Sequence, residues 1–369
     1  MLLLIPGPVA TRPEVRAALA QDIAPWDPSF RPLYAEVRAR VAAIANCDLT
    51  QHAALPLQGC GHFAVEAAVR SLIPPGGKLL VPMCGSYAER MARLAREAGR
   101  VVVPLPAPSE VPLDPAALAA ALAADAEISH VGLVYSETSS GVVHDPMTTA
   151  DVVRAAGRRV ILDAVSAFGA LPFDMQAHPE IDAAIFTANK CLEGMPGVSF
   201  VLARSAALAA GRAGSWSFDL YDVLQNGLKD NWGSFRFTPP AQVMAALRTA
   251  LRLHEAEGGQ PARLARYRAN ADTLYDGMLR IGLRPYVDRA HQGPIVLNVH
   301  APADPAWSLQ GFVDALKARG FLISNFYNTT TPSFRVGCIG AITPSDMARF
   351  VAAADAALTE MGVRVRAAA

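Results

Sequence analysis

The sequence predicts an α/β protein in which a large domain with a mostly parallel sheet precedes a smaller C-terminal α+β domain. Between about residues 52 and 204, short apolar runs alternate with segments of helical periodicity. The apolar runs are continuous rather than alternating, as expected for strands whose two faces are both covered by helices. After about Glu257 the pattern changes to strand, helix, two strands and helix, which suits a small α+β domain of about 100 residues.

The first 15 residues are predicted to form a separate N-terminal segment, followed by a large domain over 16–257 and a small domain over 258–369. An early helix is indicated by Thr11, Pro13 and Glu14, which would supply an N-cap, a first-turn proline and a capping-box carboxylate. Apolar residues at helical spacing predict a second helix over 33–46.

The large domain is predicted from strands and helices that follow one another along the chain. The predicted strands are 52–58, 78–83, 100–106, 130–138, 159–166, 183–189 and 198–204. The predicted helices start near His62 and cover 86–98, 114–124 and 148–157. In the small domain, the predicted helices are 262–280, 308–320 and one opening at Thr343, and the strands are 293–300, 321–326 and 333–340.

Composition narrows the class of protein. The chain has 369 residues, of which 52% are hydrophobic and 18% charged, a globular composition. Its 33 basic and 33 acidic residues balance, which removes the usual reason to expect nucleic acid or an anionic membrane as partner. The apolar N-terminus has no basic leader and is a poor signal peptide. Five scattered cysteines predict neither a disulfide framework nor a zinc site, and we expect a soluble cytoplasmic protein with no metal.

Ligands of such sheets bind beyond the carboxyl ends of the strands, so the residues at those ends are the candidate site. At the first end, two glycines flank Cys60 before a helix, where backbone N–H groups form an anion site or simply a tight turn. At the second, Tyr87 is either a core residue or a ring that stacks on a planar ligand. At the fourth, residues 136–141 form a run of hydroxyls that serves either a ligand or the loop itself.

Two charged residues close later strands. Asp163 follows four apolar residues, and a buried carboxylate calls for a cationic partner. Lys190 stands between an apolar run and a glycine-rich turn, where its ammonium would lose hydration. A simple salt bridge between the two, or a lysine reaching to the surface, is the plain alternative.

Pyridoxal phosphate is the cofactor that needs these groups together. Its aldehyde joins a lysine covalently, its pyridine nitrogen needs a carboxylate, and its phosphate suits a helix N-terminus. We therefore expect pyridoxal 5'-phosphate bound to Lys190.

The sequence also resembles the fold-type I pyridoxal-phosphate enzymes of the class V aminotransferase family. The resemblance runs nearly end to end, through segments whose order and spacing are specific: LLLIPGPV, PWD, LQGCGHFAVEA, SETSSG, LDAVSAFG, TANKCLEGMPG, DNWGSFRFTPP and SFRVGCIG. It implies that Lys190 and Asp163 are catalytic. It implies cofactor contacts from Gly61, His62, Phe63, Tyr87, Thr138, Asp163, Thr187, Lys190 and Thr238.

Within that set, the resemblance implies that backbone N–H groups of residues 61–63 and the Thr187 hydroxyl bind the phosphate, while Tyr87 stacks on the ring and Thr138 approaches the ring oxygen. It implies that Thr238 reaches the phosphate of a neighbouring subunit, and hence a homodimer with shared sites. Arg335 would bind the carboxylate of the substrate through a two-pronged contact, or else be an ordinary edge-strand arginine.

The chain departs from the family pattern at three places. The family usually has threonine where this chain has His62, the segment Ser324–Tyr327 replaces a common motif, and RFTPPA replaces RFTSPT.

The implied reaction is amino transfer from 2-aminoethylphosphonate to pyruvate, giving phosphonoacetaldehyde and L-alanine. The alternatives are an alanine– or serine–glyoxylate-type transaminase, a transaminase for a related aminophosphonate, a cysteine desulfurase or lyase, and a scaffold protein without activity. A scaffold protein would have lost Lys190 or Asp163, and both residues are present. A desulfurase or lyase needs a nucleophilic cysteine on a mobile loop, and it is disfavoured because Cys338 lies in an apolar strand.

Overall fold

The computed structural model describes residues 1–233 and 235–364. Its main sheet has seven strands in the order β2-β8-β7-β6-β5-β3-β4. These strands are β2 His52–Gln58, β3 Lys78–Met83, β4 Val101–Pro106, β5 Ile128–Val134, β6 Arg159–Asp163, β7 Ile181–Thr187 and β8 Val198–Arg204. Strand β8 runs antiparallel to both of its neighbours, and the pairs among β3 to β7 are parallel. The predicted mostly parallel sheet is confirmed.

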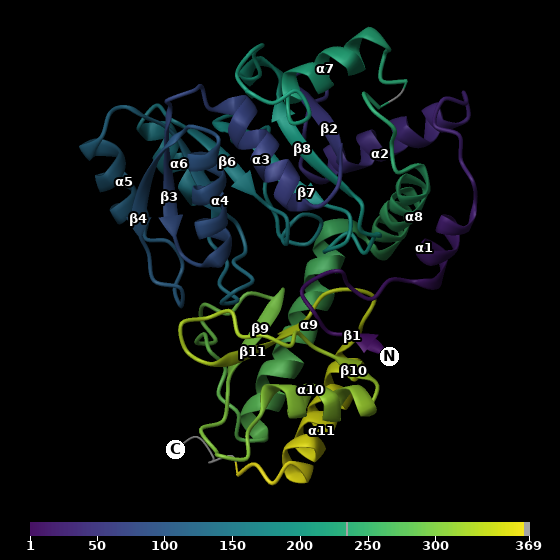
Figure 1. Ribbon diagram of the computed structural model, residues 1–369, viewed down its shortest axis with the longest axis vertical. Coiled ribbons are helices and arrows are strands. Elements are labelled where there is room, and N and C mark those ends of the chain that lie inside the picture. The colour runs from purple at the N-terminus through teal and green to yellow at the C-terminus, as the bar shows by residue number, and fades with distance from the viewer. Residues whose placement is uncertain (234, 365–369) are drawn as a thin grey trace.

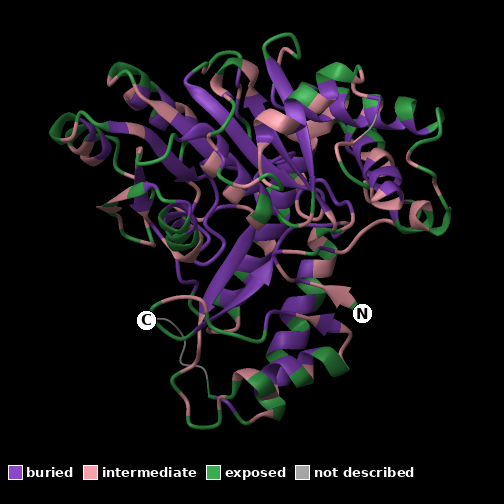
Figure 2. Cartoon of the chain, turned by 45° about the horizontal axis from the view of Figure 1, so that its top comes forward, coloured by how far each residue is buried: buried purple, intermediate pink, exposed green. Residues whose placement is uncertain are grey.

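Helices cover both faces of this sheet (Figure 1). They are α2 Phe30–Ile44, α3 Gly61–Leu72, α4 Ser86–Glu97, α5 Pro115–Ala124, α6 Pro146–Ala155, α7 Leu220–Lys229 and α8 Ala241–Glu257. One apolar core lies on each face: Phe186 and Leu162 belong to one, and Val201 and Ile161 to the other. The central strands are therefore buried on both sides, as Figure 2 shows, which explains their continuous apolar sequences.

The C-terminal part of the chain packs around the long helix α9 Gly259–Arg280 (Figure 1). Strands β9 Val296–His300 and β11 Ser333–Gly337 pair antiparallel, and α10 Leu309–Ala318 and α11 Pro344–Glu360 complete this part. The predicted order of strand, helix, two strands and helix is confirmed, although β10 is short, Phe321–Leu322, and pairs with β1. The division of the chain at residue 257 stays a prediction.

The N-terminal segment crosses from the small part of the molecule to the large one. Strand β1 Leu2–Leu3 pairs parallel with β10, and Leu4 is buried in the apolar core of the small part. Helix α1 Pro13–Ala17 then packs against α8 of the large part. The N-cap expected at Thr11 is wrong: the helix is capped at Arg12, without a side-chain capping bond, because extended backbone continues to that residue. Within the described residues, no helix has both the length and the apolar character needed to cross a membrane.

Candidate active site

Asp163 and Lys190 lie at the carboxyl ends of the adjacent parallel strands β6 and β7. Asp163 is the last residue of β6, and Lys190 stands three residues after the end of β7. Burial raises the pKa of Asp163 to about 6, although a hydrogen bond from the Val165 N–H (3.0 Å) and the charge of Lys190 act in the opposite direction. Burial lowers the pKa of Lys190, and Arg335 adds to this effect. Each group is thus shifted toward its neutral form.

The two charges do not form the simple salt bridge that was the plain alternative. No ion pair within 4.0 Å joins Lys190 to Asp163 among the described residues, although each influences the pKa of the other. The Lys190 side chain instead packs against Gly7, where an added β-carbon would lie 2.5 Å from Lys190 Cδ and 2.9 Å from Nζ. The amine is therefore held in a narrow space beside a carboxyl group that lacks a cation at contact distance.

The start of α3 meets the same edge of the sheet. Gly61 is its first residue, and a β-carbon there would lie 2.7 Å from Val165, two residues beyond Asp163. The first N–H groups of a helix lack intrahelical acceptors. The amide of Phe63 donates to the Cys60 carbonyl (3.0 Å), so Gly61 and His62 are the better placed donors for an anion. Burial and the nearby Arg90 lower the pKa of His62, so its imidazole is mainly neutral at pH 7.

Tyr87 lies in the first turn of α4 at this edge. Burial by itself would raise its pKa, but the charge of Lys190, a hydrogen bond with the Thr138 side chain and the charges of Arg335 and Arg90 together outweigh burial and lower it. Behind it, the fully buried Glu137 accepts hydrogen bonds from the Tyr87 N–H (3.2 Å) and the Ser139 N–H (3.0 Å). The hydroxyl run therefore serves partly to hold Glu137, which binds the N-terminus of α4 and so fixes where Tyr87 stands.

Arg335 of β11 reaches the site from the small part of the molecule. It is 5% exposed, donates to the Thr138 carbonyl (3.1 Å) and to Ser324 Oγ (3.3 Å), and lies 4.7 Å from the Phe326 ring. Burial lowers its pKa. Arg335 also forms a hydrogen bond with the Tyr87 side chain, and these three contacts use only part of its five N–H donors, so the guanidinium retains donors for an anionic substrate.

Two further predicted site residues are Thr187, which ends β7 at the same sheet edge, and Thr238, which lies at the surface. The Thr187 hydroxyl already lies within hydrogen-bond range of Asn189 Oδ1 (2.8 Å) and the Val198 carbonyl (3.1 Å), and a hydroxyl has a single hydrogen to donate. Thr238 is exposed at a surface hollow of about 270 Å³ that Phe63 and Phe218 also line. The structure brings together residues of α3, α4, β6, the turn after β7 and β11; the roles of all these residues stay predictions.

The sequence reasoning missed two residues at this site. Gly7 packs against Lys190, and its only signal was that Pro6-Gly7-Pro8 interrupts an apolar run. Glu137 was treated as one member of a hydroxyl-rich loop, although a carboxylate three residues after the end of the apolar strand β5 was the available signal.

The chain is similar to known proteins along most of its length. The family model for aminotransferase class V matches residues 27–310. The chain is 42% identical over 364 residues to a 2-aminoethylphosphonate–pyruvate transaminase of Pseudomonas fluorescens, covering 98% of each chain. It is 43% identical to a second such enzyme of Polaromonas, covering 98% of this chain and 97% of the relative.

Among solved structures, the fold matches an alanine–glyoxylate aminotransferase from Nostoc with a TM-score of 0.88 at 23% identity, covering 97% of this chain and 95% of that one. At that identity the match speaks for the fold alone. The family model and the full-length relatives lead to one conclusion: the chain belongs to the class-V aminotransferases.

Proposed function

We propose that this chain is a pyridoxal-phosphate-dependent transaminase that moves the amino group of 2-aminoethylphosphonate to pyruvate, giving phosphonoacetaldehyde and L-alanine. The observation that carries the proposal is the pairing, at one sheet edge, of a lysine whose pKa is lowered with a buried carboxyl group. Class-V aminotransferases use pyridoxal phosphate, and the named substrates are those of the relatives reported above.

The residues fit this cofactor. The Asp163 carboxyl group is buried with one hydrogen bond and has no cation at contact distance among the described residues, so a protonated ring nitrogen would supply the missing partner. The N–H groups of Gly61 and His62 at the start of α3 would hold the phosphate, with Phe63 and Thr187 as further predicted contacts. Tyr87 would stack on the ring, and Thr138 would lie near its oxygen. Lys190 would hold the aldehyde carbon.

Each residue then has a distinct task in the reaction. When bound, pyridoxal phosphate supplies a cationic ring that accepts the electron pair left behind when a proton leaves the amino donor. Asp163 keeps the proton on the ring nitrogen. The donor amine would displace Lys190 from the aldehyde carbon. The freed Lys190 amine, whose lowered pKa favours its neutral form, would then take the proton from the donor carbon and deliver it to the carbon that had carried the aldehyde. Arg335 holds the phosphonate of the donor in one half-reaction and the carboxylate of the acceptor in the other.

The same proposal includes a homodimer. Thr238 is exposed and lies beside Phe237, and Trp26, which lines a second hollow with Thr238, is 75% exposed. Large exposed aromatic side chains gathered on one surface favour a partner there. A second copy of the chain would bring Thr238 toward the phosphate of its neighbour.

Light scattering of the purified protein should give twice the chain mass, and Phe237→Asp should shift the measured mass toward that of the monomer. A wild-type monomer that is active would refute shared sites.

The substrate assignment is tested with purified protein, added cofactor and a panel of amines. Alanine should form from pyruvate and 2-aminoethylphosphonate, together with an equal amount of phosphonoacetaldehyde, and Lys190→Ala should form none. Asp182→Asn serves as the matched control, because Asp182 is a buried carboxylate at the opposite end of β7. Alanine from serine or another donor but not from 2-aminoethylphosphonate would reject the substrate. Glycine formed from glyoxylate with alanine or serine as donor would favour the glyoxylate-type alternative.

A further inference from the structure

The turn that carries Lys190 is fixed by its own backbone. The Glu193 N–H donates to the Lys190 carbonyl (2.9 Å), and the Gly194 N–H donates to the Ala188 carbonyl (2.8 Å). Glu193 adopts a left-handed conformation with φ of 56°, which costs a residue with a β-carbon about 1 kcal/mol. Something outside the turn must therefore favour glutamate at this position.

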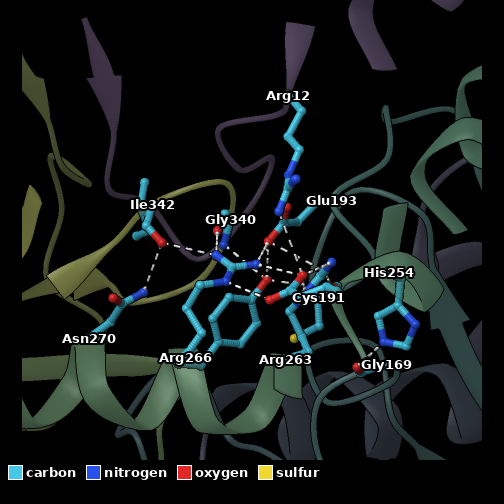
Figure 3. A network of polar contacts seen from close by, with 12 residues as sticks. Arg12, Gly169, Cys191, Glu193, His254, Arg263, Arg266, Asn270, Gly340 and Ile342 are labelled. Atoms are coloured by element: carbon cyan, nitrogen blue, oxygen red, sulfur yellow. Dashed lines mark hydrogen bonds and ion pairs between the residues drawn. The ribbon is translucent and has the colours of Figure 1, made fainter. Parts of the chain in front are cut away.

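The Glu193 side chain is buried in a network of charged residues (Figure 3). It is 3% exposed and accepts hydrogen bonds from Arg266 Nη2 (2.6 Å) and the Tyr267 hydroxyl (2.8 Å), both on helix α9. From the same helix, Arg263 donates to the Cys191 carbonyl, inside the lysine turn. Glu257 and Glu193 each pair with both arginines, so two carboxylates balance two guanidinium groups. The turn is thus held at two points by α9.

The same side chains of α9 also hold the chain that follows β11. Arg266 Nη1 donates to the carbonyls of Gly340 (2.6 Å) and Ile342 (2.9 Å), and the Tyr267 hydroxyl accepts from the Gly340 N–H (3.1 Å). Figure 3 shows Arg266 between Glu193 on one side and Gly340 and Ile342 on the other. Strand β11 carries Arg335 and ends at Gly337, so a continuous set of polar contacts joins the lysine turn to the segment that directly follows the strand of the proposed substrate-binding arginine.

We propose that Glu193 is a positioning residue for the reaction: through Arg266 and Tyr267 it sets where the Lys190 amine stands relative to Arg335. The proposal rests on the function proposed above. Among the described residues, no hydrogen bond or ion pair joins the Glu193 side chain to Lys190, so Glu193 acts through the turn and through α9. Releasing it would let the amine move away from its narrow space beside Gly7, with loss of the alignment that proton transfer requires.

A first measurement uses the full chain without cofactor. Competitive labelling with acetic anhydride over a series of pH values, read by peptide mass spectrometry, gives the midpoint at which Lys190 loses its proton. The groups that act on this amine are Tyr87, Arg335, Cys191 and Asp163. In Glu193→Gln the midpoint should rise by at least about half a pH unit, because the displaced amine regains water. A direct charge effect would lower it instead, since a negative charge has been removed.

A second measurement uses the loaded enzyme. Glu193→Gln should lower kcat about 10-fold while changing KM for the amine less than about 2-fold, because alignment and not substrate binding is lost. The matched control is Asp182→Asn, which removes another buried carboxylate held by two arginines, Arg159 and Arg204, away from the site. It should leave both the labelling midpoint and kcat unchanged.

The outcomes separate this proposal from the function on which it rests. If the wild-type protein forms no alanine, the function fails. If the wild-type protein is active and Glu193→Gln matches it in kcat and in labelling midpoint, the positioning role alone is refuted. Should Glu193→Gln not fold, Tyr267→Phe removes one of its hydrogen bonds and should shift the midpoint in the same direction. An unchanged midpoint in Tyr267→Phe would then refute the role.

Discussion

Gly7 and Lys190 are in direct contact, although 183 positions separate them in the sequence. A β-carbon built on Gly7 would lie 2.5 Å from Cδ, 2.7 Å from Cε and 2.9 Å from Nζ of the lysine. The N-terminal segment reaches this point because β1 is paired with β10 and the Gly337 N–H donates to the Leu4 carbonyl (2.7 Å). The start of the chain therefore forms one wall of the space that the amine occupies.

Replacing Gly7 by alanine should displace the lysine amine. A side chain at 2.5 Å forces Lys190 to move by several tenths of an ångström or more, and misplacement on the scale of 1 Å costs about 100-fold in rate. We expect Gly7→Ala to lower kcat by about 10- to 100-fold, measured as alanine formed from saturating amine and pyruvate.

The control for this variant is Gly76→Ala. Gly76 also has a positive φ, 74° against 145° at Gly7, and nothing lies within 4 Å of its added β-carbon, so it tests a positive φ without the contact. It should lose about 1 kcal/mol of stability and keep its kcat. Equal loss of activity in both variants would attribute the effect to strain and contradict the role of Gly7 in confining Lys190.

Asp163 should make the stability of the cofactor-free protein depend on pH. Burial raises the pKa of Asp163 in the folded state from an ordinary 3.8 to about 6, so folding favours the neutral carboxyl group. The contribution of Asp163 to the free energy of unfolding is therefore most favourable at low pH and is lost as the pH rises through about 6. A shift of this size corresponds to about 3 kcal/mol. Asp163→Asn should therefore stabilise the cofactor-free chain by up to about 3 kcal/mol at pH 8, and by little at pH 4.

Urea unfolding at pH 8 and pH 4 measures the difference in the free energy of unfolding between Asp163→Asn and wild type. A titration with pyridoxal phosphate completes the test. The same Asp163→Asn variant should bind pyridoxal phosphate more weakly, because the ring nitrogen loses its anionic partner. A variant that is less stable than wild type at pH 8 without cofactor would show that the carboxylate is already satisfied by the protein, contrary to this account.

Arg335→Lys should weaken the use of pyruvate while preserving the charge. Lysine cannot reproduce the planar two-pronged contact, and its loss corresponds to about a 10- to 100-fold fall in kcat/KM for pyruvate at saturating amine. Arg100→Lys is the control, because Arg100 is also buried and donates to the backbone carbonyls of Ile73, Arg70 and Arg212, away from the site. It should change stability but keep kcat/KM within about 2-fold. Parallel losses in both variants would mean that Arg335 acts through folding.

Much of the large part of the fold could be predicted because its strands carry a local signal. Three predicted strands, 52–58, 78–83 and 198–204, match the observed bounds, since continuous apolar runs mark strands covered on both faces. The same rule placed Asp163 and Lys190 at one sheet edge, because parallel strands end together.

The rest depends on contacts that leave no local pattern. The antiparallel course of β8 was not predicted, because strand direction is set by connections and not by composition. Helices α7 and α8 were also not predicted, but α8 carries apolar residues at helical spacing, so a local signal for it was overlooked. The contact of Gly7 with Lys190 and the hold of Arg266 on Glu193 join residues 183 and 73 positions apart. Such pairings arise only once the two parts of the molecule are packed together.

The central claim is that the Lys190 amine holds the cofactor aldehyde. It is tested most directly by loading the protein with pyridoxal phosphate, reducing it with borohydride, and mapping the modified peptide by mass spectrometry. The account predicts one modified residue per chain, Lys190, and no stable adduct in Lys190→Ala. A reduced adduct on any other lysine, or a wild-type protein that takes up no cofactor, would contradict it.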